Sequence, residues 1–311
     1  MAFPAHQRAG PVCSACAEPA VFFQRHTGLH LCGLHLIEEV ERNVRTTISS
    51  RQMICPDDRV AVALSGGKDS TALLLILNRL LASRTDVQLV AITVDEGIHG
   101  YREDTIRSAE DLVSRLGIEH HCISFSELFG GTLDTFLKNR PEQACSICGI
   151  LRRKALIVGA ELAGATKLAT GHNLDDEAQS VMMNVLRGDL PRLIRDTGTD
   201  SSGLFIPRIK PLSYMYEKEI AAYLMLSGAW NDLPECPYAV HALRREARSI
   251  LATLEYRYPG TMLNLMKSKI KIKEACLGKI PSEPIRHCRE CGDPCSGDLC
   301  QLCRLRQTLT L

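Results

Sequence analysis

The six residues Ser65-Gly66-Gly67-Lys68-Asp69-Ser70 directly follow an apolar, β-branched stretch of the chain. The two glycines let the backbone approach a ligand closely and adopt positive φ. An apolar helical pattern comes next, so the first N–H groups of that helix and the positive end of its dipole would face an anion in the turn. The lysine would add a positive charge, and the serines would add hydroxyl donors. We therefore predict a phosphate-binding loop rather than an ordinary strand-to-helix turn. It is not a Walker loop, in which Ser or Thr follows the lysine.

A second polar cluster, at residues 170–177, opens a predicted helix. Asn173 could cap this helix, and Asp175, Asp176 and Glu177 would favour the positive end of its dipole. Capping alone would explain the motif. Beside a phosphate loop, the same carboxylates could also hold Mg²⁺ against pyrophosphate oxygens.

Three central cysteines, Cys145, Cys148 and Cys236, have no evident fourth ligand. The first two form a Cys-x-x-Cys pair at a helix start, and the third lies far along the chain. Zinc sites normally have four ligands, so three thiols make an unusual zinc site. Three thiolates on a 4Fe–4S cluster would leave one iron with an open position, which could carry a reactive sulfur atom. A redox pair with a spare thiol is the alternative.

The two ends of the chain carry denser cysteine patterns. A Cys-x-x-Cys pair is followed by Cys-x-x-His near the N-terminus, and two Cys-x-x-Cys pairs lie near the C-terminus. These spacings suit tetrahedral zinc without an open ligand position, so we predict two structural zinc ribbons. Cys295 lies between the C-terminal pairs and could be unused or compete as a ligand. The predicted ligands are Cys13, Cys16, Cys32 and His35 at one end and Cys288, Cys291, Cys300 and Cys303 at the other.

The composition bounds the class of protein. The chain has 311 residues, which corresponds to about two domains, and a formal net charge of +1. No apolar run reaches the length of about 20 residues that a membrane span needs, and no secretion signal is evident, so we expect a cytoplasmic protein. In that setting the 14 cysteines indicate metal or redox chemistry rather than a disulfide framework.

Hydrophobic periodicity indicates the elements that position these residues. Apolar strands alternate with amphipathic helices from residue 59 onward. This alternation predicts an α/β fold with a parallel sheet, helices on both faces, and ligands beyond the carboxyl ends of the strands. The phosphate loop and the acidic motif both fall at such ends. The predicted strands are 59–64, 87–95, 119–124 and 167–170, and the predicted helices are 35–48, 69–83, 101–116, 127–138, 146–163, 173–187 and 216–227.

Basic residues gather in the second half of the chain. Residues 189–215 are predicted to form a loop across the mouth of the site, and residues 238–275 have a helical pattern. Contact with RNA phosphate and a simple solvated surface both fit these charges. The basic residues are Arg187, Arg192, Arg195, Arg208 and Lys210 around the loop, and Arg244, Arg245, Arg248, Lys267, Lys269, Lys271 and Lys273 in the helical segment. We place the domain boundaries at 1–50, 51–235, 236–280 and 281–311.

Three motifs resemble those of PP-loop ATP pyrophosphatases that act on tRNA: the phosphate loop, Val94-Asp-Glu-Gly97 and the acidic motif. When the cysteines are considered with these motifs, the resemblance extends over nearly the whole chain, to the TtuA-type tRNA 2-thiouridine synthetases and their archaeal and eukaryotic cytosolic relatives. The resemblance implies that Cys145, Cys148 and Cys236 bind a 4Fe–4S cluster, followed by a basic residue, here Arg152. Because an arginine stays charged, it would clamp phosphate rather than carry a proton. The implied ATP contacts are Ala63, the loop at 65–70, Ile92, Arg152, Gly171 and Asp176.

These observations lead to the hypothesis of tRNA uridine 2-thiolation. ATP would adenylate the C2 carbonyl oxygen, with the pyrophosphate stabilised by Mg²⁺, the loop and Lys68. A hydrosulfide on the open iron would then displace AMP. Asp176 could hold Mg²⁺ or assist proton transfer.

Three alternatives stay open at this point. A cluster-free thiolase would use a Cys145–Cys236 persulfide pair, a PP-loop ligase would form an amide or amidine, and a non-catalytic module would only bind RNA or sense redox state. The resemblance also implies a homodimer, and either a ubiquitin-like thiocarboxylate protein or sulfide as the sulfur donor. It does not identify the uridine, and Cys55, Cys122 and Cys276 receive no role.

Overall fold

The computed structural model describes residues 10–138, 140–194, 205–238, 243–276, 279 and 285–308. Its centre is a five-stranded sheet in which all paired strands are parallel and the order is β5-β4-β3-β6-β7. The chain runs outward from β3 to β5 and then returns to the other side of β3, which confirms the predicted α/β fold. The strands are β3 (Arg59–Ala63), β4 (Gln88–Asp95), β5 (Glu119–Ser124), β6 (Lys167–Ala169) and β7 (Arg208–Ile209).

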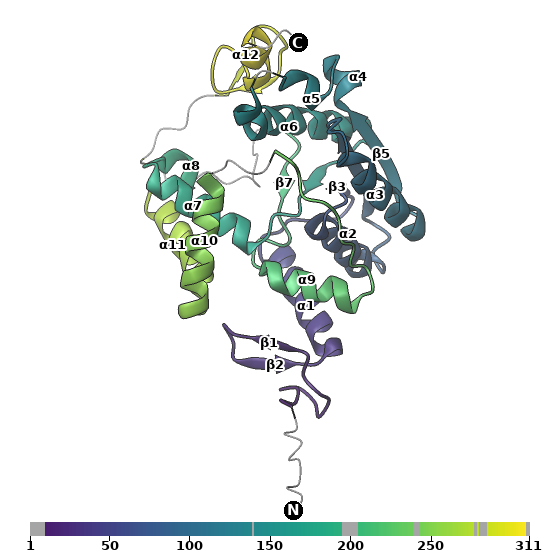
Figure 1. The fold of residues 1–311 in the computed structure, drawn as a ribbon, viewed down its shortest axis with the longest axis vertical. Coiled ribbons are helices and arrows are strands. Elements are labelled where there is room, and N and C mark those ends of the chain that lie inside the picture. Colours follow the sequence, from purple (N-terminus) through teal and green to yellow (C-terminus); the bar gives the residue numbers. More distant parts are fainter. Residues whose placement is uncertain are drawn as a thin grey trace, which may run out of the picture.

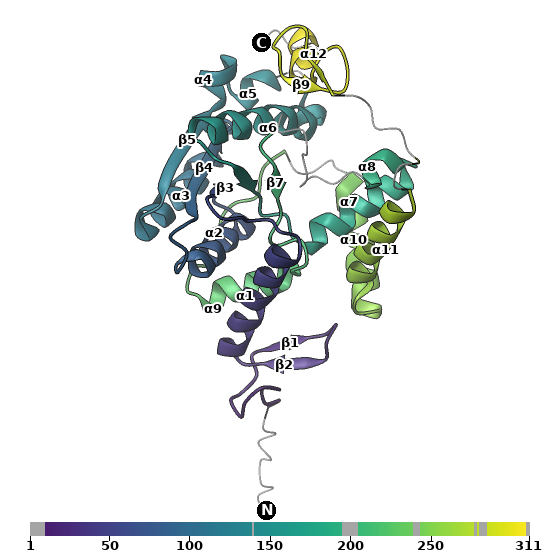
Figure 2. The ribbon, with the colours of Figure 1, turned by 180° about the vertical axis from the view of Figure 1, so that it is seen from behind.

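Helices cover both faces of this sheet (Figures 1 and 2). Alternate side chains of a strand point to opposite faces, so Val60 and Val62 of β3 join one hydrophobic core and Ala61 joins the other. Each face therefore buries its own apolar set. The first face carries α1 (Gly33–Ser50), α2 (Lys68–Leu81), α3 (Arg102–Leu116) and α9 (Glu217–Leu226), and the second carries α4 (Phe125–Phe129), α5 (Leu133–Phe136) and α6 (Ala144–Leu162).

Four helices form a third hydrophobic cluster beside the sheet, on the left in Figure 1. Each helix contributes a side chain that is at most 4% exposed: Val181, Leu193, Leu251 and Met262. Because one of these helices starts at the carboxyl end of β6, the cluster is attached directly to the edge where ligands bind. The helices are α7 (Leu174–Leu186), α8 (Leu190–Ile194), α10 (Leu243–Arg257) and α11 (Thr261–Cys276).

Several predicted elements differ from the structure. In the described part of residues 189–215, the expected loop contains α8 and the edge strand β7. The predicted helix 127–138 is divided between α4 and α5 at Gly130 and Gly131, and the pattern of 238–275 is divided between α10 and α11 at Pro259 and Gly260. Glycine and proline end helices through backbone conformation, which hydrophobic periodicity does not report.

The two cysteine-rich ends lie at opposite ends of the long axis (Figures 1 and 2). The N-terminal ribbon contacts α9, where the Gln24 amide donates to the Glu219 carboxylate at 2.9 Å and both side chains are buried. The C-terminal ribbon contacts α6, where Lys154 Nζ lies 2.7 Å from Asp293. The elements of the ribbons are β1 (Phe22–Gln24), β2 (Leu29–Leu31), β8 (Arg286–His287), β9 (Pro294–Cys295) and α12 (Gln301–Thr308).

Within the described ranges, no helix has the combination of length and apolar sequence needed to cross a bilayer.

Candidate nucleotide and cluster site

The phosphate loop and the acidic motif meet at the carboxyl edge of the sheet. The loop at 65–70 follows β3, and the motif at 170–177 follows β6. These two strands are neighbours, and the strand order reverses between them, because β4 and β5 lie on the other side of β3. Ligands of open α/β sheets bind at such a switch point. Sequence reasoning placed both motifs at strand ends, and the structure brings them together.

The loop is held by its own hydroxyl groups. The Ser65 N–H donates to Ser70 Oγ at 3.1 Å, and Ser70 Oγ donates to the Gly67 carbonyl at 2.9 Å. The two hydroxyl oxygens lie 3.0 Å apart. Helix α2 starts at Lys68, so its first N–H groups open toward this turn. The backbone thus forms a small cradle of donors with a positive dipole end.

Glycine is required at two positions, because the backbone of another segment lies too close to leave room for a Cβ atom. Gly66 has φ +84°, and a Cβ placed on it would lie 2.1 Å from the Thr105 carbonyl oxygen. A Cβ on Gly171 would lie 3.0 Å from the backbone of Asp69 and Ser70. Gly66 therefore lets the loop pack against α3, and Gly171 lets the segment after β6 lie against the start of α2.

We expect Gly66→Ala to lower the ATP affinity strongly. The substitution forces a positive φ on alanine, at a cost of about 1–2 kcal/mol, and adds a clash with a carbonyl oxygen that is part of the backbone. Calorimetric titration with ATP and thermal unfolding would measure both effects. Gly117→Ala is the matched control, because Gly117 has φ +65° with open space around it. Equal ATP affinity in the two variants would contradict the role of Gly66.

Lys68 is held by carboxylates on two elements. Its Nζ lies 2.8 Å from Asp69 Oδ2 and 2.8 Å from Glu217 Oε1 at the start of α9. Burial lowers the pKa of Lys68, but the two carboxylates outweigh burial and raise it above the ordinary value. Glu217 also pairs with Arg248 of α10 at 2.7 Å. Sequence reasoning missed Glu217, because nothing in the pattern at the start of α9 points to a lysine so far away in the chain.

The acidic motif caps α7 and also contacts the phosphate loop. Asn173 Oδ1 accepts from the Asp176 N–H at 3.0 Å, as the capping prediction requires, and Asn173 Nδ2 donates to Asp69 Oδ1 at 3.1 Å. Glu177 is paired with Lys210 at 2.6 Å. Asp176 makes longer contacts, 3.7 Å to Arg244 for example. It is thus the carboxylate of this motif most open to a metal ion, and its Mg²⁺ role stays a prediction.

The three central thiols gather at the start of α6. Cys148 is 8% exposed, and Cys236 packs in the same hydrophobic cluster from a distant segment. Cys145 Sγ lies 3.7 Å from the carbonyl of Tyr238, two residues beyond Cys236. The pKa of the Cys148 thiol is raised to about 11, chiefly by burial and against the opposing charge of Arg152, with smaller contributions from the charges of Glu96, Cys236 and Cys145. The start of α6 and the segment of Cys236 to Tyr238 therefore lie together.

The spacing of these thiols differs from that of a single-ion site. In the described part of the chain, the sets of at least three ligand atoms that lie within 4.8 Å of one another are the two terminal ones. The central thiols are not such a set. A cubane cluster binds each thiolate to a different iron, so its ligands stand wider apart than those of one ion. Three thiols with a neighbouring arginine to offset negative charge therefore fit a cluster better than zinc.

Arg152 and Glu96 connect this site to the phosphate loop. Arg152 Nη2 donates to Cys148 Sγ at 3.2 Å, and its Nε donates to Glu96 Oε1 at 2.6 Å. Glu96 Oε2 lies 2.7 Å from Arg102 Nε, and Arg102 Nη1 donates to the Ser65 carbonyl at 2.9 Å. Glu96 belongs to the Val94–Gly97 motif, but its pairing with two arginines was not predicted. The predicted phosphate contact of Arg152 stays a prediction.

Two of the predicted ATP contacts, Ala63 and Ile92, belong to neighbouring strands. Ala63 ends β3 and pairs with Ile92 of β4. The Ile92 side chain is fully buried, and its carbonyl accepts the Leu64 N–H at 2.8 Å. Any nucleotide contact of Ile92 would thus have to involve its backbone.

Both terminal ligand sets converge as predicted. In the N-terminal set, His35 Nδ1 lies 3.2 Å from Cys32 Sγ and 3.5 Å from Cys13 Sγ. In the C-terminal set, the N–H groups of Cys300 and Cys291 lower the pKa of Cys288 to about 6, which favours the thiolate that a metal needs. Cys295 lies outside that set and donates to the Gly297 carbonyl at 2.9 Å. Each converging set can hold one metal ion. The remaining ligands are Cys16, Cys291 and Cys303.

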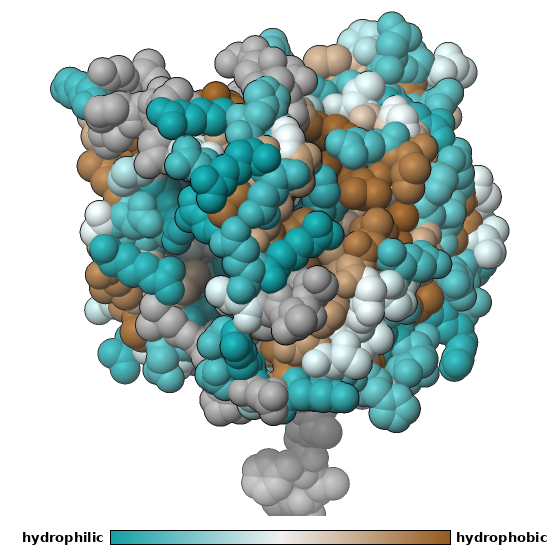
Figure 3. Space-filling model, turned by 90° about the horizontal axis from the view of Figure 1, so that it is seen from above, coloured by the Kyte–Doolittle hydropathy of each residue, from teal (hydrophilic) through white to brown (hydrophobic). Residues whose placement is uncertain are grey.

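The basic residues take two kinds of position. Arg244 and Lys210 pair with the acidic motif, and Arg248 pairs with Glu217, so these face the nucleotide site. Lys267 and Lys271 are exposed, one helical turn apart on α11. Seen from above, the molecule shows hydrophilic surface beside a hydrophobic patch (Figure 3). Arg195 lies outside the described residues.

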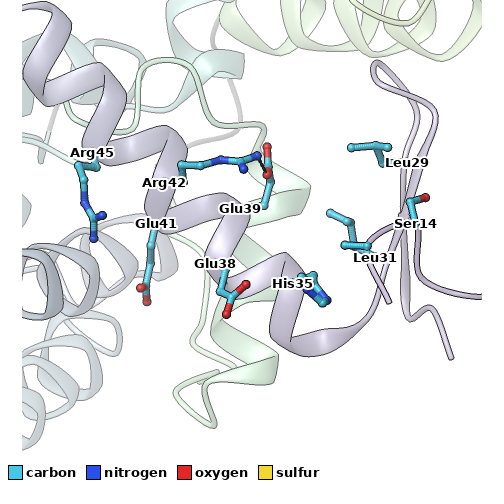
Figure 4. A pocket seen from close by; sticks show the side chains of 10 residues that line it. Ser14, Leu29, Leu31, His35, Glu38, Glu39, Glu41, Arg42 and Arg45 are labelled. Carbon is cyan, nitrogen blue, oxygen red and sulfur yellow. Dashed lines mark hydrogen bonds and ion pairs between the residues drawn. The ribbon is translucent and has the colours of Figure 1, made fainter. Parts of the chain in front are cut away.

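A cleft of about 440 Å³ lies between the N-terminal ribbon and α1 (Figure 4). Leu29, Leu31 and Ser14 line it from the ribbon, and charged side chains line it from the helix. It contains none of the residues of the loop or of the central cysteine site.

Comparison with known proteins gives matches over nearly the whole chain. A family model described as a PP-loop domain matches residues 36–231. The chain is 35% identical over 316 residues to tRNA 2-thiolation protein NcsA of Haloferax volcanii, covering 96% of this chain and 98% of the relative. It is 37% identical over 304 residues to cytoplasmic tRNA 2-thiolation protein 1 of Mus musculus, covering 95% and 72%. A solved structure, the U34-tRNA thiolase NcsA from Methanococcus maripaludis with its 4Fe–4S cluster, superposes with a TM-score of 0.83 at 32% identity over 96% of each chain.

Proposed function

The chain belongs to the tRNA 2-thiolation family of PP-loop proteins, and from this premise we propose that it replaces the C2 oxygen of a tRNA uridine with sulfur in two steps, the first of which consumes ATP. It is a tRNA sulfurtransferase in class. The observation that carries the proposal is the placement of three thiols and a phosphate loop at one edge of the sheet, joined through Arg152, Glu96 and Arg102.

In the first step the uridine C2 oxygen attacks the α-phosphorus of ATP. The bond to pyrophosphate breaks, the uridine loses its N3 proton to solvent, and the products are an O²-adenylyl uridine and pyrophosphate. Negative charge develops on the departing pyrophosphate, and the N–H groups at the start of α2 and the Lys68 ammonium lie where they would stabilise it. Asp176 would hold Mg²⁺ against the same oxygens.

In the second step a hydrosulfide adds to C2 and AMP leaves, carrying away the original oxygen. The carbon is now a good electrophile, because adenylation has turned its oxygen into a leaving group. Cys145, Cys148 and Cys236 would hold the 4Fe–4S cluster, which supplies an iron with an open position for sulfur. Arg152, 3.2 Å from Cys148 Sγ, offsets negative charge at this site.

The terminal ribbons are proposed to hold one structural Zn²⁺ each. Four ligands close each site, so no position is left for substrate. Their contacts indicate what they support: the N-terminal ribbon packs on α9, whose first residue reaches Lys68, and the C-terminal ribbon packs on α6, which carries two of the central cysteines.

The tRNA is proposed to dock on the helical cluster of α7, α8, α10 and α11. We take U34 as the target, since the similar solved enzyme is a U34-tRNA thiolase, and a cytoplasmic location, since the eukaryotic relatives are named cytoplasmic. The identity of the sulfur donor, the homodimer and the predicted domain boundaries stay predictions.

If α11 contacts RNA phosphates, Lys267→Gln/Lys271→Gln should weaken tRNA binding and flatten its salt dependence. Each lost phosphate contact removes about 0.7–0.9 from the slope of log K against log salt concentration, so the double variant should lose about 1.4–1.8. Fluorescence anisotropy with labelled tRNA at several salt concentrations would measure the slope. Arg107→Gln/Arg115→Gln on α3 is the control with the same change of charge. An equal loss of slope in both double variants would argue against a specific docking surface.

Nucleoside mass spectrometry tests the proposed reaction directly. The protein, purified anaerobically, would be incubated with unmodified tRNA, ATP, Mg²⁺ and sulfide. We expect one AMP and one pyrophosphate for each 2-thiouridine that forms. Pyrophosphate release without any sulfur-containing nucleoside would contradict thiolation and favour an ATP-dependent ligase, and no tRNA-dependent pyrophosphate at all would favour a non-catalytic RNA-binding module.

A further inference from the structure

We propose that Glu96 is a positioning residue that holds the phosphate loop and the central cysteine site in fixed relation, through Arg102 on one side and Arg152 on the other. The proposal rests on the proposed function, because it assigns the cysteine site to the cluster. The partners of the Glu96 carboxylate are arginines, and it is assigned no contact with ATP or with sulfur. It acts by orienting two arginines that do reach those sites.

On the nucleotide side, Arg102 fixes the backbone around the loop. Its side chain is 4% exposed, and Nη1 donates both to the Ser65 carbonyl at 2.9 Å and to Thr105 Oγ1 at 2.8 Å. Nη2 donates to the Val94 carbonyl, near the end of β4. Arg102 therefore ties together the start of the loop, the end of β4 and the turn of α3 against which Gly66 packs.

On the cysteine side, Arg152 is held between Glu96 and Cys148. Its Nε donates to Glu96 Oε1 at 2.6 Å while Nη2 donates to Cys148 Sγ at 3.2 Å. The side chain is 47% exposed, so little besides these two contacts would restrain a long, flexible arginine. The Glu96 contact thus selects the rotamer that reaches the sulfur.

Each carboxylate oxygen of Glu96 contacts a different arginine. Oε1 accepts from Arg152 Nε, Oε2 lies 2.7 Å from Arg102 Nε in an ion pair without hydrogen-bond geometry, and the carboxylate is 3% exposed. Its two positive partners exceed its single negative charge, so an anion bound on either side is attracted, and the attraction is screened less at the buried Arg102 than at the half-exposed Arg152. A carboxylate one methylene shorter could not reach both arginines from the same backbone position.

Glu96→Asp tests the linkage, because it keeps the charge and shortens the reach. Two measurements are made: the ATP affinity of the cluster-free protein by calorimetry, and the cluster reduction potential by EPR-monitored titration. We expect about a tenfold loss of ATP affinity, as for the loss of one contact between charged groups. We also expect a lower reduction potential, because loss of a hydrogen bond and a positive charge at a ligand sulfur disfavours the reduced cluster.

Arg152→Gln is the one-sided reference variant. It should lower the potential in the same direction, and any change in its ATP affinity reports the predicted phosphate contact of Arg152 alone, since the Arg102 contacts persist. A Glu96→Asp protein with wild-type affinity and potential would overturn the proposal, even if its unfolding temperature fell, because a merely structural ion pair predicts that result.

If Glu96→Asp does not fold, Glu96→Gln/Arg152→Gln restores the charge balance by removing one charge of each sign. Its ATP affinity should fall below that of Arg152→Gln, because the neutral amide holds Arg102 less firmly. Equal affinities would show that Glu96 does not act on the loop. Neither readout requires thiolation, so a protein that holds no cluster contradicts the proposed function, whereas an intact cluster with both readouts unmoved contradicts only the role of Glu96.

Discussion

Lys68→Met is expected to reduce tRNA-dependent pyrophosphate release and 2-thiouridine formation by about 10²- to 10³-fold, the usual effect of removing one donor to a developing negative charge. Methionine keeps the unbranched shape of the side chain but removes the charge. The loss should appear mainly in kcat, because the ammonium stabilises the departing pyrophosphate more than the bound ATP. Pyrophosphate-release and nucleoside assays over a range of ATP concentrations would measure both rates and separate kcat from KM.

Arg115→Met is the matched control for this variant. Arg115 is exposed in the last turn of α3, which lies at the opposite edge of the sheet from the loop, and its loss also removes one positive charge. Wild-type rates in both variants would remove Lys68 from the mechanism. A rise of KM with unchanged kcat would instead show that Lys68 only helps to bind ATP.

The pairing of Lys68 with Glu217 has a consequence for this experiment. Lys68 is held by Asp69 and Glu217, and Glu217 is held in turn by Arg248. A phosphate must therefore compete with two carboxylates for the ammonium. Since Arg248 lies on α10, at the proposed tRNA-binding cluster, RNA contact with α10 would weaken its hold on Glu217 and so affect Lys68 as well.

Local sequence was sufficient for the parts of the site that depend on backbone geometry. The loop at 65–70 could be predicted because glycines, a lysine and a helix start lie within six residues. The convergence of the loop with the acidic motif followed from the parallel sheet, whose strand ends share one edge. The metal ligand sets were predictable for a similar reason, since the Cys-x-x-Cys turn itself aims two sulfurs at one ion.

The rest depends on side chains that only the tertiary fold brings together. Glu96 and Arg152 are 56 positions apart, and Gln24 and Glu219 are 195 apart. No periodicity encodes such a pair, and an ion pair between residues far apart in the chain has no local signature. The docking of each ribbon was equally hidden, because a hairpin of three-residue strands carries too little apolar surface to indicate its partner.

Cys236→Ala is expected to abolish thiolation together with the bound iron. In a cluster-binding protein, iron and acid-labile sulfide should fall from about four each per chain to near zero. Cys236 is the most informative of the three thiols to replace, because it lies in a partly exposed segment between elements rather than in a helix core. The loop and its contacts do not include it, so ATP affinity should persist. Zinc should also persist, since the terminal ribbons supply separate ligands.

Cys122→Ala is the control for this loss, because Cys122 is an exposed thiol on β5 outside all three cysteine groups. It should keep iron, sulfide and activity.

The outcome also separates the chemical alternatives. If iron-free protein purified in air thiolates tRNA and only Cys145→Ala and Cys236→Ala are inactive, the sulfur travels as a persulfide and the cluster proposal is wrong. If Cys145→Ser retains full ATP-dependent activity on tRNA, the thiols do no chemistry and the protein joins an amine rather than sulfur to the activated base.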